Sequence, residues 1–401
     1  MKKVVKFGGS SLASAEQFKK VGNIIRKEES RRYVIPSAPG KRTPDDTKVT
    51  DMLYSCYGQA ILGEDAEKDF EEQLEAIKER YNSIISGLDL ELSLDEEFKT
   101  IRTNFSKKIG RDYAASRGEY LNGIIMAAYL GYEFIDAAEV IVFDENGNFD
   151  GDKTHEILSA RLENTERAVI PGFYGAKPDG SIQTFSRGGS DITGSIVAKA
   201  VHADMYENWT DVSGFLIADP RIIKNPKPID VITYRELREL SYMGATVLHE
   251  DAIFPVRKEG IPINIRNTNA PEDKGTLIVE DTCRKPRFTI TGIAGKKDFA
   301  SITIEKAMMN SEVGFCRKVL EVFENNHISI EHMPSGIDTM TIFVHRDEFE
   351  EKEQDVIAGI HRAVEPDFLE LESDPENMDN INEIFRAAHS LKGMAGTMGY
   401  K

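Results

Sequence analysis

The chain is predicted to be an α/β protein, with an open, mostly parallel sheet covered by helices on both faces, followed by a smaller α+β region. Three observations predict this. A short apolar segment at residues 3–7 leads through a glycine turn into a helical pattern at 13–28, the strand, turn and helix order of α/β folds. Apolar strand-like segments return between residues 132 and 209. Beyond residue 286 the order becomes strand, helix, strand, strand, helix, which is most of a βαββαβ unit.

Composition excludes several classes of function. The 401 residues carry 50 basic and 68 acidic side chains, a formal charge of −18, which opposes attraction to nucleic acid or to an anionic membrane. No apolar run approaches the roughly 18 residues of a membrane span, and the N-terminus lacks a signal-peptide pattern, so we expect a cytoplasmic protein. Cys56, Cys283 and Cys316 form no C-x-x-C pair, and the eight histidines form no ligand-like cluster. We therefore expect neither a disulfide framework nor a metal held by the protein's own ligands.

The first 280 residues read as one α/β domain with an insertion. Long, acidic, helically periodic segments at residues 51–108 predict a helical insertion over the sheet. Strands are expected at 3–7, 32–37, 132–135, 140–143, 168–172, 205–209, 261–266 and 276–279, and further helices at 13–28, 192–201, 234–240 and 245–254. A polar stretch at 280–286 predicts a linker. After it, helices are expected at 312–325 and 352–364 and strands at 327–332 and 339–344.

Four loops bring charged or small residues to the ends of apolar strands. They span residues 6–10, 37–40, 186–191 and 210–221. Loops at the carboxyl ends of parallel strands converge, and two of these are glycine turns at a helix start, where unpaired N–H groups favour a phosphate chain. Lys6, Arg187 and Arg221 would offset its charge. The glycine tetrad at 8–11 also fits an ordinary helix cap when taken alone, but the converging loops favour phosphoryl transfer, which needs mainly positioned cations and N–H donors.

Six motifs, in order, resemble those of the aspartate kinases, a family within the amino-acid kinase superfamily. They are Lys6-Phe-Gly-Gly-Ser-Ser11, Val49-Thr-Asp51, Ser116-Arg-Gly-Glu119, Phe185-Ser-Arg-Gly-Gly-Ser-Asp191, Trp209-Thr-Asp211 and Ala218-Asp-Pro-Arg221. The resemblance covers residues 1 to about 373. It implies the amino-acid kinase fold at 1–280 and transfer of the ATP γ-phosphoryl group, with Mg²⁺, to the side-chain carboxylate of L-aspartate. The product would be 4-phospho-L-aspartate, which opens the synthesis of lysine, threonine and methionine.

The resemblance also implies roles for individual residues. Lys6 would balance charge on the transferred phosphoryl group, and Asp191 would orient Lys6. ATP contacts are implied for Gly8, Gly9, Ser10, Ser37, Thr210, Asp211 and Arg221, and contacts to aspartate for Thr50, Glu119, Arg187 and Ser190. Taken alone, Arg187 would suit a surface cation and Glu119 a solvated helix residue. Their places inside matched motifs favour the site roles.

Residues 288–373 resemble an ACT domain, a module that senses small molecules and pairs between chains. The resemblance implies an amino-acid effector near Ser311, Gly314 and Phe315, and a homo-oligomer formed through this region. The alternative is a helix start that merely packs on its own sheet. The family continues into a second ACT unit, which is largely replaced here.

The segment 374–401 resembles instead a fragment of the histidine-containing phosphotransfer (Hpt) domain of chemotaxis histidine kinases, with His389 at the phosphorylated position. Such domains need about four helices, so we expect this short segment to be a passive tail. The alternative function is a non-catalytic sensing or phosphorelay protein that uses His389. The intact set of loops in the first 280 residues favours the kinase.

Overall fold

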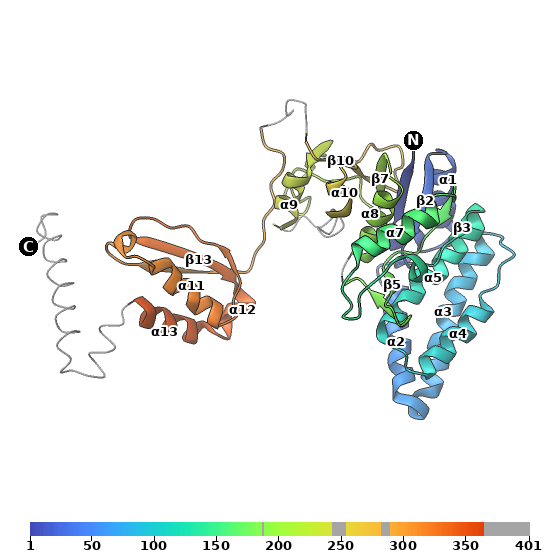
Figure 1. Ribbon diagram of the computed structural model, residues 1–401, viewed down its shortest axis with the longest axis horizontal. Coiled ribbons are helices and arrows are strands. Elements are labelled where there is room, and N and C mark those ends of the chain that lie inside the picture. The colour runs from blue at the N-terminus through green and yellow to red at the C-terminus, as the bar shows by residue number, and fades with distance from the viewer. Residues whose placement is uncertain (187, 243–253, 282–288, 365–401) are drawn as a thin grey trace, which may run out of the picture. The chain divides into compact units, whose positions relative to one another are not determined.

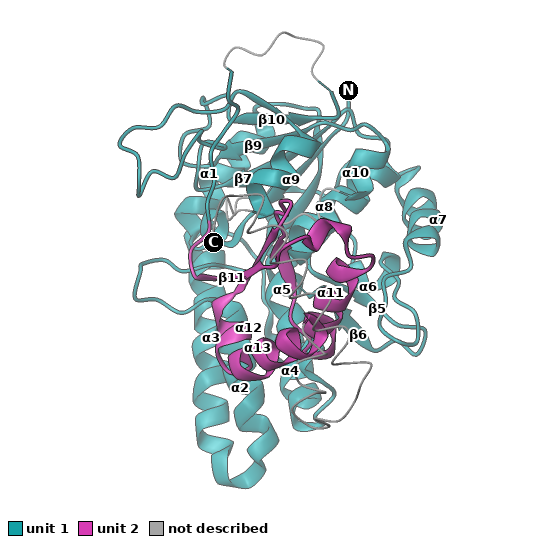
Figure 2. Cartoon of the chain, turned by 90° about the vertical axis from the view of Figure 1, so that its left-hand side faces the viewer, with its two compact units in different colours: residues 1–295 teal, residues 296–401 magenta. Residues whose placement is uncertain are grey.

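The computed structural model describes residues 1–186, 188–242, 254–281 and 289–364. The chain divides into two compact units, Met1–Gly295 and Lys296–Lys401 (Figure 2). The boundaries that the sequence predicts for its domains, near residues 280, 288 and 373, stay predictions beside this division. Among the described residues no helix is both long enough and apolar enough to cross a membrane.

The first unit is built on a sheet in the strand order β3-β4-β2-β1-β7-β9-β10-β8. Its pairings are parallel except for β9 with β10, so the mostly parallel sheet predicted from the sequence is confirmed. The strands are β1 (Lys3–Phe7), β2 (Arg31–Pro36), β3 (Glu133–Phe134), β4 (Ala168–Val169), β7 (Met205–Thr210), β8 (Val231–Thr233), β9 (Ile263–Asn267) and β10 (Thr276–Val279).

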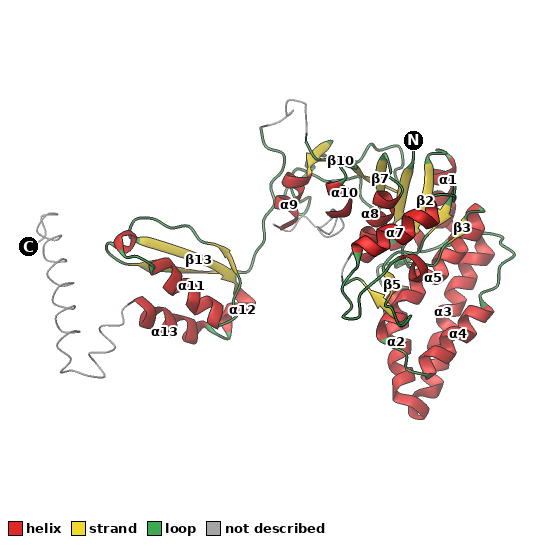
Figure 3. Cartoon of the chain, viewed as in Figure 1, coloured by secondary structure: helices red, strands yellow, loops and turns green. Residues whose placement is uncertain are grey.

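Helices cover both faces of this sheet, because alternate side chains of each strand point to opposite faces (Figures 1 and 3). In β1, Val4 joins one apolar core, whereas Val5 and Phe7 join the other. The core of Val5 contains α1 (Ala15–Arg26), α2 (Val49–Leu62), α3 (Glu67–Gly87), α4 (Asp95–Ser106) and α5 (Arg111–Leu130). The core of Val4 contains α6 (Ala137–Val140), α7 (Gly151–Leu162), α8 (Gly189–Ala200), α9 (Tyr234–Tyr242) and α10 (Phe254–Lys258).

Some elements differ from the sequence prediction. The strand predicted at residues 140–143 is wrong: the one-turn helix α6 ends at Val140, and Val142 and Phe143 make isolated bridges. Asp136 starts that helix by accepting a hydrogen bond from the backbone N–H of Ala138. Helix α5 was not predicted as an element, because most of it is buried and it lacks an amphipathic pattern. A hairpin of β5 (Tyr174–Ala176) and β6 (Ile182–Thr184) was also missed. The helix predicted at 245–254 lies almost wholly outside the described residues.

The second unit has the predicted strands and helices in the predicted order, with one short α-helix, at Arg346–Glu350, that was not predicted. Its sheet, in the order β11-β13-β12, is antiparallel. The elements of this unit are, in chain order, β11 (Phe299–Glu305), α11 (Phe315–Asn325), β12 (Ile330–His332), β13 (Thr339–His345), α12 (Arg346–Glu350) and α13 (Glu353–Val364). Val319 of α11, Ile342 of β13 and Val356 of α13 share one core, so the helices pack on one face of this sheet.

Candidate active site

The first feature of the site is an ion pair between Lys6 and Asp191. Lys6 lies in the central strand β1, and Asp191 lies in the first turn of α8, after Gly188 at a φ of 59°. The Lys6 Nζ is 2.6 Å from the Asp191 Oδ1. Asn208, which is opposite Lys6 in the β1–β7 register, donates from its Nδ2 to the same Oδ1 at 2.7 Å. Two donors from neighbouring strands therefore fix one carboxylate at the carboxyl edge of the sheet.

The glycine turn after β1 offers backbone donors beside this pair. Gly9 and Ser10 open a short 3₁₀ helix, Gly9–Leu12, and the first N–H groups of a helix have no acceptor within it. The Gly8 N–H, in contrast, donates to the Trp209 carbonyl at 3.0 Å. The resemblance implied that Gly8, Gly9 and Ser10 bind the phosphates of ATP. In the described structure the N–H groups of Gly9 and Ser10 are therefore free to bind a ligand, whereas the N–H of Gly8 is used in a hydrogen bond to strand β7.

A cavity of about 640 Å³ opens at this turn. Six of the residues implied by the sequence line it together: Gly9, Ser10, Ser37, Thr50, Glu119 and Asp211. They come from the turn after β1, the loop after β2, α2, α5 and the loop after β7. Residues far apart in the sequence thus meet at one edge of the sheet, as the convergence of loops predicts.

Glu119 is the residue of the cavity whose pKa is shifted most strongly. Its side chain is buried, and its Oε2 has no hydrogen-bond partner in the described structure. Burial raises the pKa of Glu119 to about 8, outweighing the backbone hydrogen bond at Ala38 and the charges of Lys6 and Arg117. A buried, unpartnered carboxyl group at a cavity wall is suited to receive a cation such as an ammonium group.

Other residues assigned from the sequence lie elsewhere. Arg221 does not line the cavity: its side chain is 85% exposed and pairs with Asp219 at 2.7 Å. Thr210 donates from its hydroxyl to Asp211 at 3.2 Å, and Ser190 is buried in α8 against Gly172. Arg187 lies outside the described residues.

The residues implied in effector binding belong to the second unit. Ser311 is exposed, and Gly314 caps α11 at a φ of 86°. Phe315 is 2% exposed in the core of the unit, and its N–H donates to the Glu312 carbonyl at 3.3 Å, so this residue offers little to a ligand. His389 lies outside the described residues.

Sequence reasoning missed two groups of residues at the site. Asn208 is buried in the parallel strand β7, and a buried amide side chain is a signal that a polar partner lies nearby. The loop after β2 contributes Lys41, Arg42 and Lys48 to the cavity lining. The cluster of cations in Lys41-Arg-Thr-Pro-Asp-Asp-Thr-Lys48 was visible in the sequence, but its contact with the glycine turn was not.

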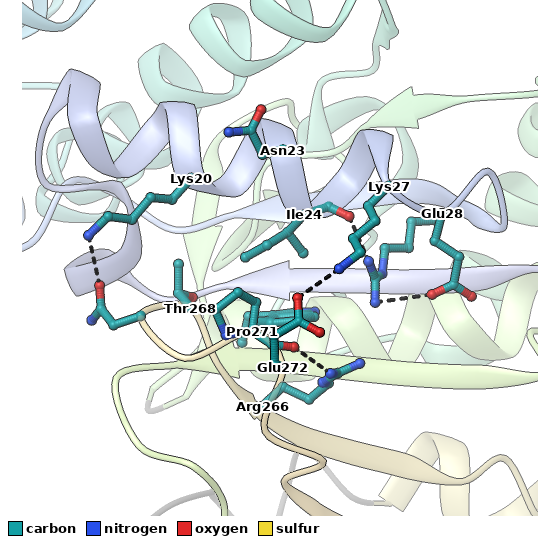
Figure 4. Close-up of a pocket in the computed structure, with 12 residues that line it drawn as sticks. Lys20, Asn23, Ile24, Lys27, Glu28, Arg266, Thr268, Pro271 and Glu272 are labelled. Atoms are coloured by element: carbon teal, nitrogen blue, oxygen red, sulfur yellow. Dashed lines mark hydrogen bonds and ion pairs between the residues drawn. The ribbon is translucent and has the colours of Figure 1, made fainter.

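A second cavity, of about 650 Å³, lies between α1 and the segment after β9 (Figure 4). Lys20 of α1 and Lys27, the residue that caps the end of α1, line this cavity. Lys27 pairs with Glu272 at 2.7 Å, and Lys20 donates to the Asn269 side chain at 3.2 Å. Arg266, in β9, also lines the cavity and donates to the Pro271 carbonyl at 2.7 Å. Lys27 is thus paired with a carboxylate, and Lys20 and Arg266 donate to uncharged oxygens, although the Arg266 Nε has no hydrogen-bond partner in the described structure.

Family models and curated relatives match most of the chain. The model of the amino acid kinase family matches residues 1–267, and that of the Hpt domain matches residues 346–401, which includes α12 and α13. Aspartokinase 3 of Bacillus subtilis (strain 168) is 40% identical over 91% of this chain and 83% of its own length. Chloroplastic aspartokinase 1 of Arabidopsis thaliana is 32% identical over 82% of this chain, which spans 60% of that relative.

Solved structures show the same similarity. The aspartate kinase of Clostridium acetobutylicum is 52% identical and superposes with a TM-score of 0.82, covering 91% of this chain and 83% of the other. Escherichia coli aspartokinase III, solved in complex with aspartate and ADP, is 23% identical with a TM-score of 0.67 and covers 86% of this chain and 79% of its own. The second likeness supports the fold alone.

Proposed function

Because the chain belongs to the amino acid kinase family, as an aspartokinase, we propose that it transfers the γ-phosphoryl group of Mg-ATP to the side-chain carboxylate of L-aspartate. The product is 4-phospho-L-aspartate, an intermediate on the way to lysine, threonine and methionine. The observation that carries this proposal is the 2.6 Å Lys6–Asp191 pair beside the open helix start at Gly9 and Ser10.

Phosphoryl transfer depends on positioned charge rather than on covalent chemistry by the protein. The Lys6 ammonium balances the charge that develops on the migrating group, and the N–H groups of Gly9 and Ser10 hold its oxygens. Asp191 keeps Lys6 in place through their ion pair, and Asn208 fixes Asp191. These groups are fixed before substrate binds, so little reorganisation is needed in the transition state.

The acceptor occupies the part of the cavity lined by Thr50 and Glu119. Ionised Glu119 pairs with the ammonium group of aspartate, and Arg187 pairs with a carboxylate, for which its planar donors are suited. Asp211 and Ser37 lie on the nucleotide side. Mg²⁺ enters with the phosphates of ATP. Among the described residues no three side chains of His, Cys, Asp or Glu gather to hold a metal by themselves.

A coupled assay of ADP release tests this function. With Mg-ATP, release is expected to depend on L-aspartate, and L-glutamate serves as the matched control with one more methylene group. Equal turnover with glutamate, or none with aspartate, would reject the assignment.

Regulation through the second unit is also proposed. The exposed backbone of Gly314 at the start of α11 and the exposed side chain of Ser311 suit the carboxylate of an amino-acid effector, and chains would associate through this region. Inhibition of ADP release by lysine or threonine, measured in the same assay, tests this proposal, and no response to either amino acid would count against it.

The Hpt match at residues 346–401 favours a second candidate function, phosphorelay through His389. Incubation with an ATP-charged chemotaxis histidine kinase tests it. Stoichiometric acid-labile phosphate that is lost in His389→Gln would establish that function, whereas absence of labelling would leave a passive tail.

A further inference from the structure

The loop of residues 38–48 is fastened to the glycine turn of the active site. The Gly40 N–H donates to the Gly9 carbonyl at 2.8 Å, and the Val49 N–H donates to the Pro39 carbonyl at 3.2 Å. The backbones approach so closely that a Cβ on Gly40 would lie 2.6 Å from the Gly9 carbonyl carbon, and a Cβ on Gly9 would lie 2.9 Å from the Ala38 oxygen. Glycine is required at both positions because the two loops pack backbone against backbone.

One buried arginine of the helical insertion holds both parts of this loop. Arg80, in α3, is 4% exposed. Its NH2 donates to the Gly40 carbonyl and its NH1 to the Asp46 Oδ2, each at 2.7 Å. Arg42 also donates to Asp46, and hydrogen bonds from Arg42 and Arg80 hold the pKa of Asp46 well below its usual range. Asp46 therefore stays ionised, and the loop is anchored at Gly40 and at Asp46.

Of the three cationic side chains of this loop, one has no partner in the described structure and can bind a ligand. Lys41, Arg42 and Lys48 all line the 640 Å³ cavity. The Arg42 guanidinium is engaged by Asp46, and the Lys41 Nζ donates to the Pro44 carbonyl at 3.2 Å. The Lys48 ammonium has no hydrogen-bond or ion-pair partner among the described residues. Lys48 is also the cap residue of α2, two positions before Thr50 on the acceptor side of the cavity.

We infer that Lys48 binds a carboxylate of the amino-acid acceptor, and that Arg80 and Asp46 are positioning residues that hold the Lys48 loop over the glycine turn. Aspartate carries two carboxylates, and the sequence motifs supply one cation for them, Arg187. The inference rests on the proposed function and names a second cation on the acceptor side of the same site. An ammonium that lines a substrate cavity without an internal partner is satisfied when an anionic ligand enters.

Steady-state kinetics of Lys48→Ala tests the inference. The KM for aspartate is expected to rise about tenfold, the effect of losing one hydrogen bond to a charged group, while the KM for ATP stays within twofold. Lys48→Arg should restore most of the affinity because it keeps the charge. The matched control is Lys27→Ala, which removes a lysine of the second cavity. A rise in the KM for ATP instead, or no change in either KM, would overturn the inference.

The role of Arg80 is tested by Arg80→Lys alone and combined with Lys48→Ala. Lysine keeps the charge but cannot bridge Gly40 and Asp46, so the single variant should raise the KM for aspartate with a folded circular-dichroism spectrum. If Arg80 acts by placing Lys48, its effect should largely vanish in the Lys48→Ala background. Fully additive effects would reject the positioning role. Absence of aspartate-dependent ADP release in the unsubstituted chain would reject the proposed function itself, which separates the two failures.

Discussion

Two cavities of the first unit have nearly the same volume, about 640 and 650 Å³, and differ in how their charges are satisfied. In the cavity beside α1, Lys27 is paired with Glu272 and Lys20 bonds to Asn269 (Figure 4). In the cavity at the glycine turn, Lys48 and the Glu119 Oε2 have no partner among the described residues. The Arg266 Nε of the second cavity also lacks a hydrogen-bond partner in the described structure, so the contrast rests on Glu119 and Lys48. A buried carboxyl group without a partner, which costs free energy, and an exposed ammonium without a counter-ion among the described residues distinguish the candidate active site more than size does.

Buried charges next to the second cavity are also satisfied by partners within the chain. Glu207, on β7, is fully buried and accepts hydrogen bonds from Lys3, Arg31 and the Trp209 indole. Burial alone would raise the pKa of Glu207, but Arg31 and Lys3 outweigh it and the pKa is lowered. We interpret this network as structural. The predictions below test the contrast, beginning with the largest expected effect.

Glu207→Gln should lower the free energy of unfolding by about 3 to 5 kcal/mol, because Arg31 and Lys3 would lose their buried counter-charge. Urea unfolding followed by circular dichroism measures this. Any activity that remains should keep its KM values. An unchanged unfolding midpoint would show that the network is dispensable and would weaken the contrast.

Lys6→Ala should lower kcat by about 10² to 10³, with little change in the KM for ATP, since its charge acts mainly in the transition state. Lys2→Ala, a neighbouring exposed lysine, is the matched control. A pure KM effect would reassign Lys6 to ground-state binding.

The KM for aspartate should depend on pH through Glu119. Because burial raises the pKa of Glu119 to about 8, the Glu119 carboxyl group of the empty site is mostly protonated at pH 7 and must lose its proton to hold an ammonium group. The KM should fall about tenfold from pH 6 to pH 7 and level off above pH 8. Glu119→Gln should raise the KM and remove its pH dependence, and a flat profile in the unsubstituted enzyme would contradict the assignment.

The same group has an effect on stability with a definite sign. Between its ordinary pKa of 4.5 and the folded value of about 8, the folded state holds more protons than the unfolded chain. Stability contributed by Glu119 is therefore present at low pH and is lost as the pH rises through this window.

The smallest effect is expected for Lys27→Ala. Lys27 and Glu272 are 69% and 81% exposed, so their ion pair is screened by solvent. Neither the melting temperature nor the KM for aspartate or ATP should change measurably. A clear kinetic change would show that the second cavity communicates with the first.

Local patterns in the sequence were enough to predict much of the fold. The strand at residues 3–7 is found with the bounds predicted, and the helical insertion appears as α2, α3 and α4. Two failures of the prediction have different reasons, burial in one and a helix cap in the other. Helix α5 is buried around much of its circumference, so no polar face marks it in the sequence, and the segment after Asp136 follows its cap rather than its apolar composition.

The sequence by itself determined the α/β class, the family and the loops that carry the site, because glycine turns, helix periodicity and motif residues are encoded over a few neighbouring positions. Tertiary structure decided which backbone and side-chain groups of those loops remain free to bind a ligand. It engages the Gly8 N–H with Trp209, joins Asn208 to Asp191, ties Gly40 and Asp46 to Arg80, and leaves Arg221 outside the cavity. These outcomes depend on burial and pairing between residues that folding brings together across many positions of the chain. No local pattern specifies which partner a charge finds, or the pKa that follows from it.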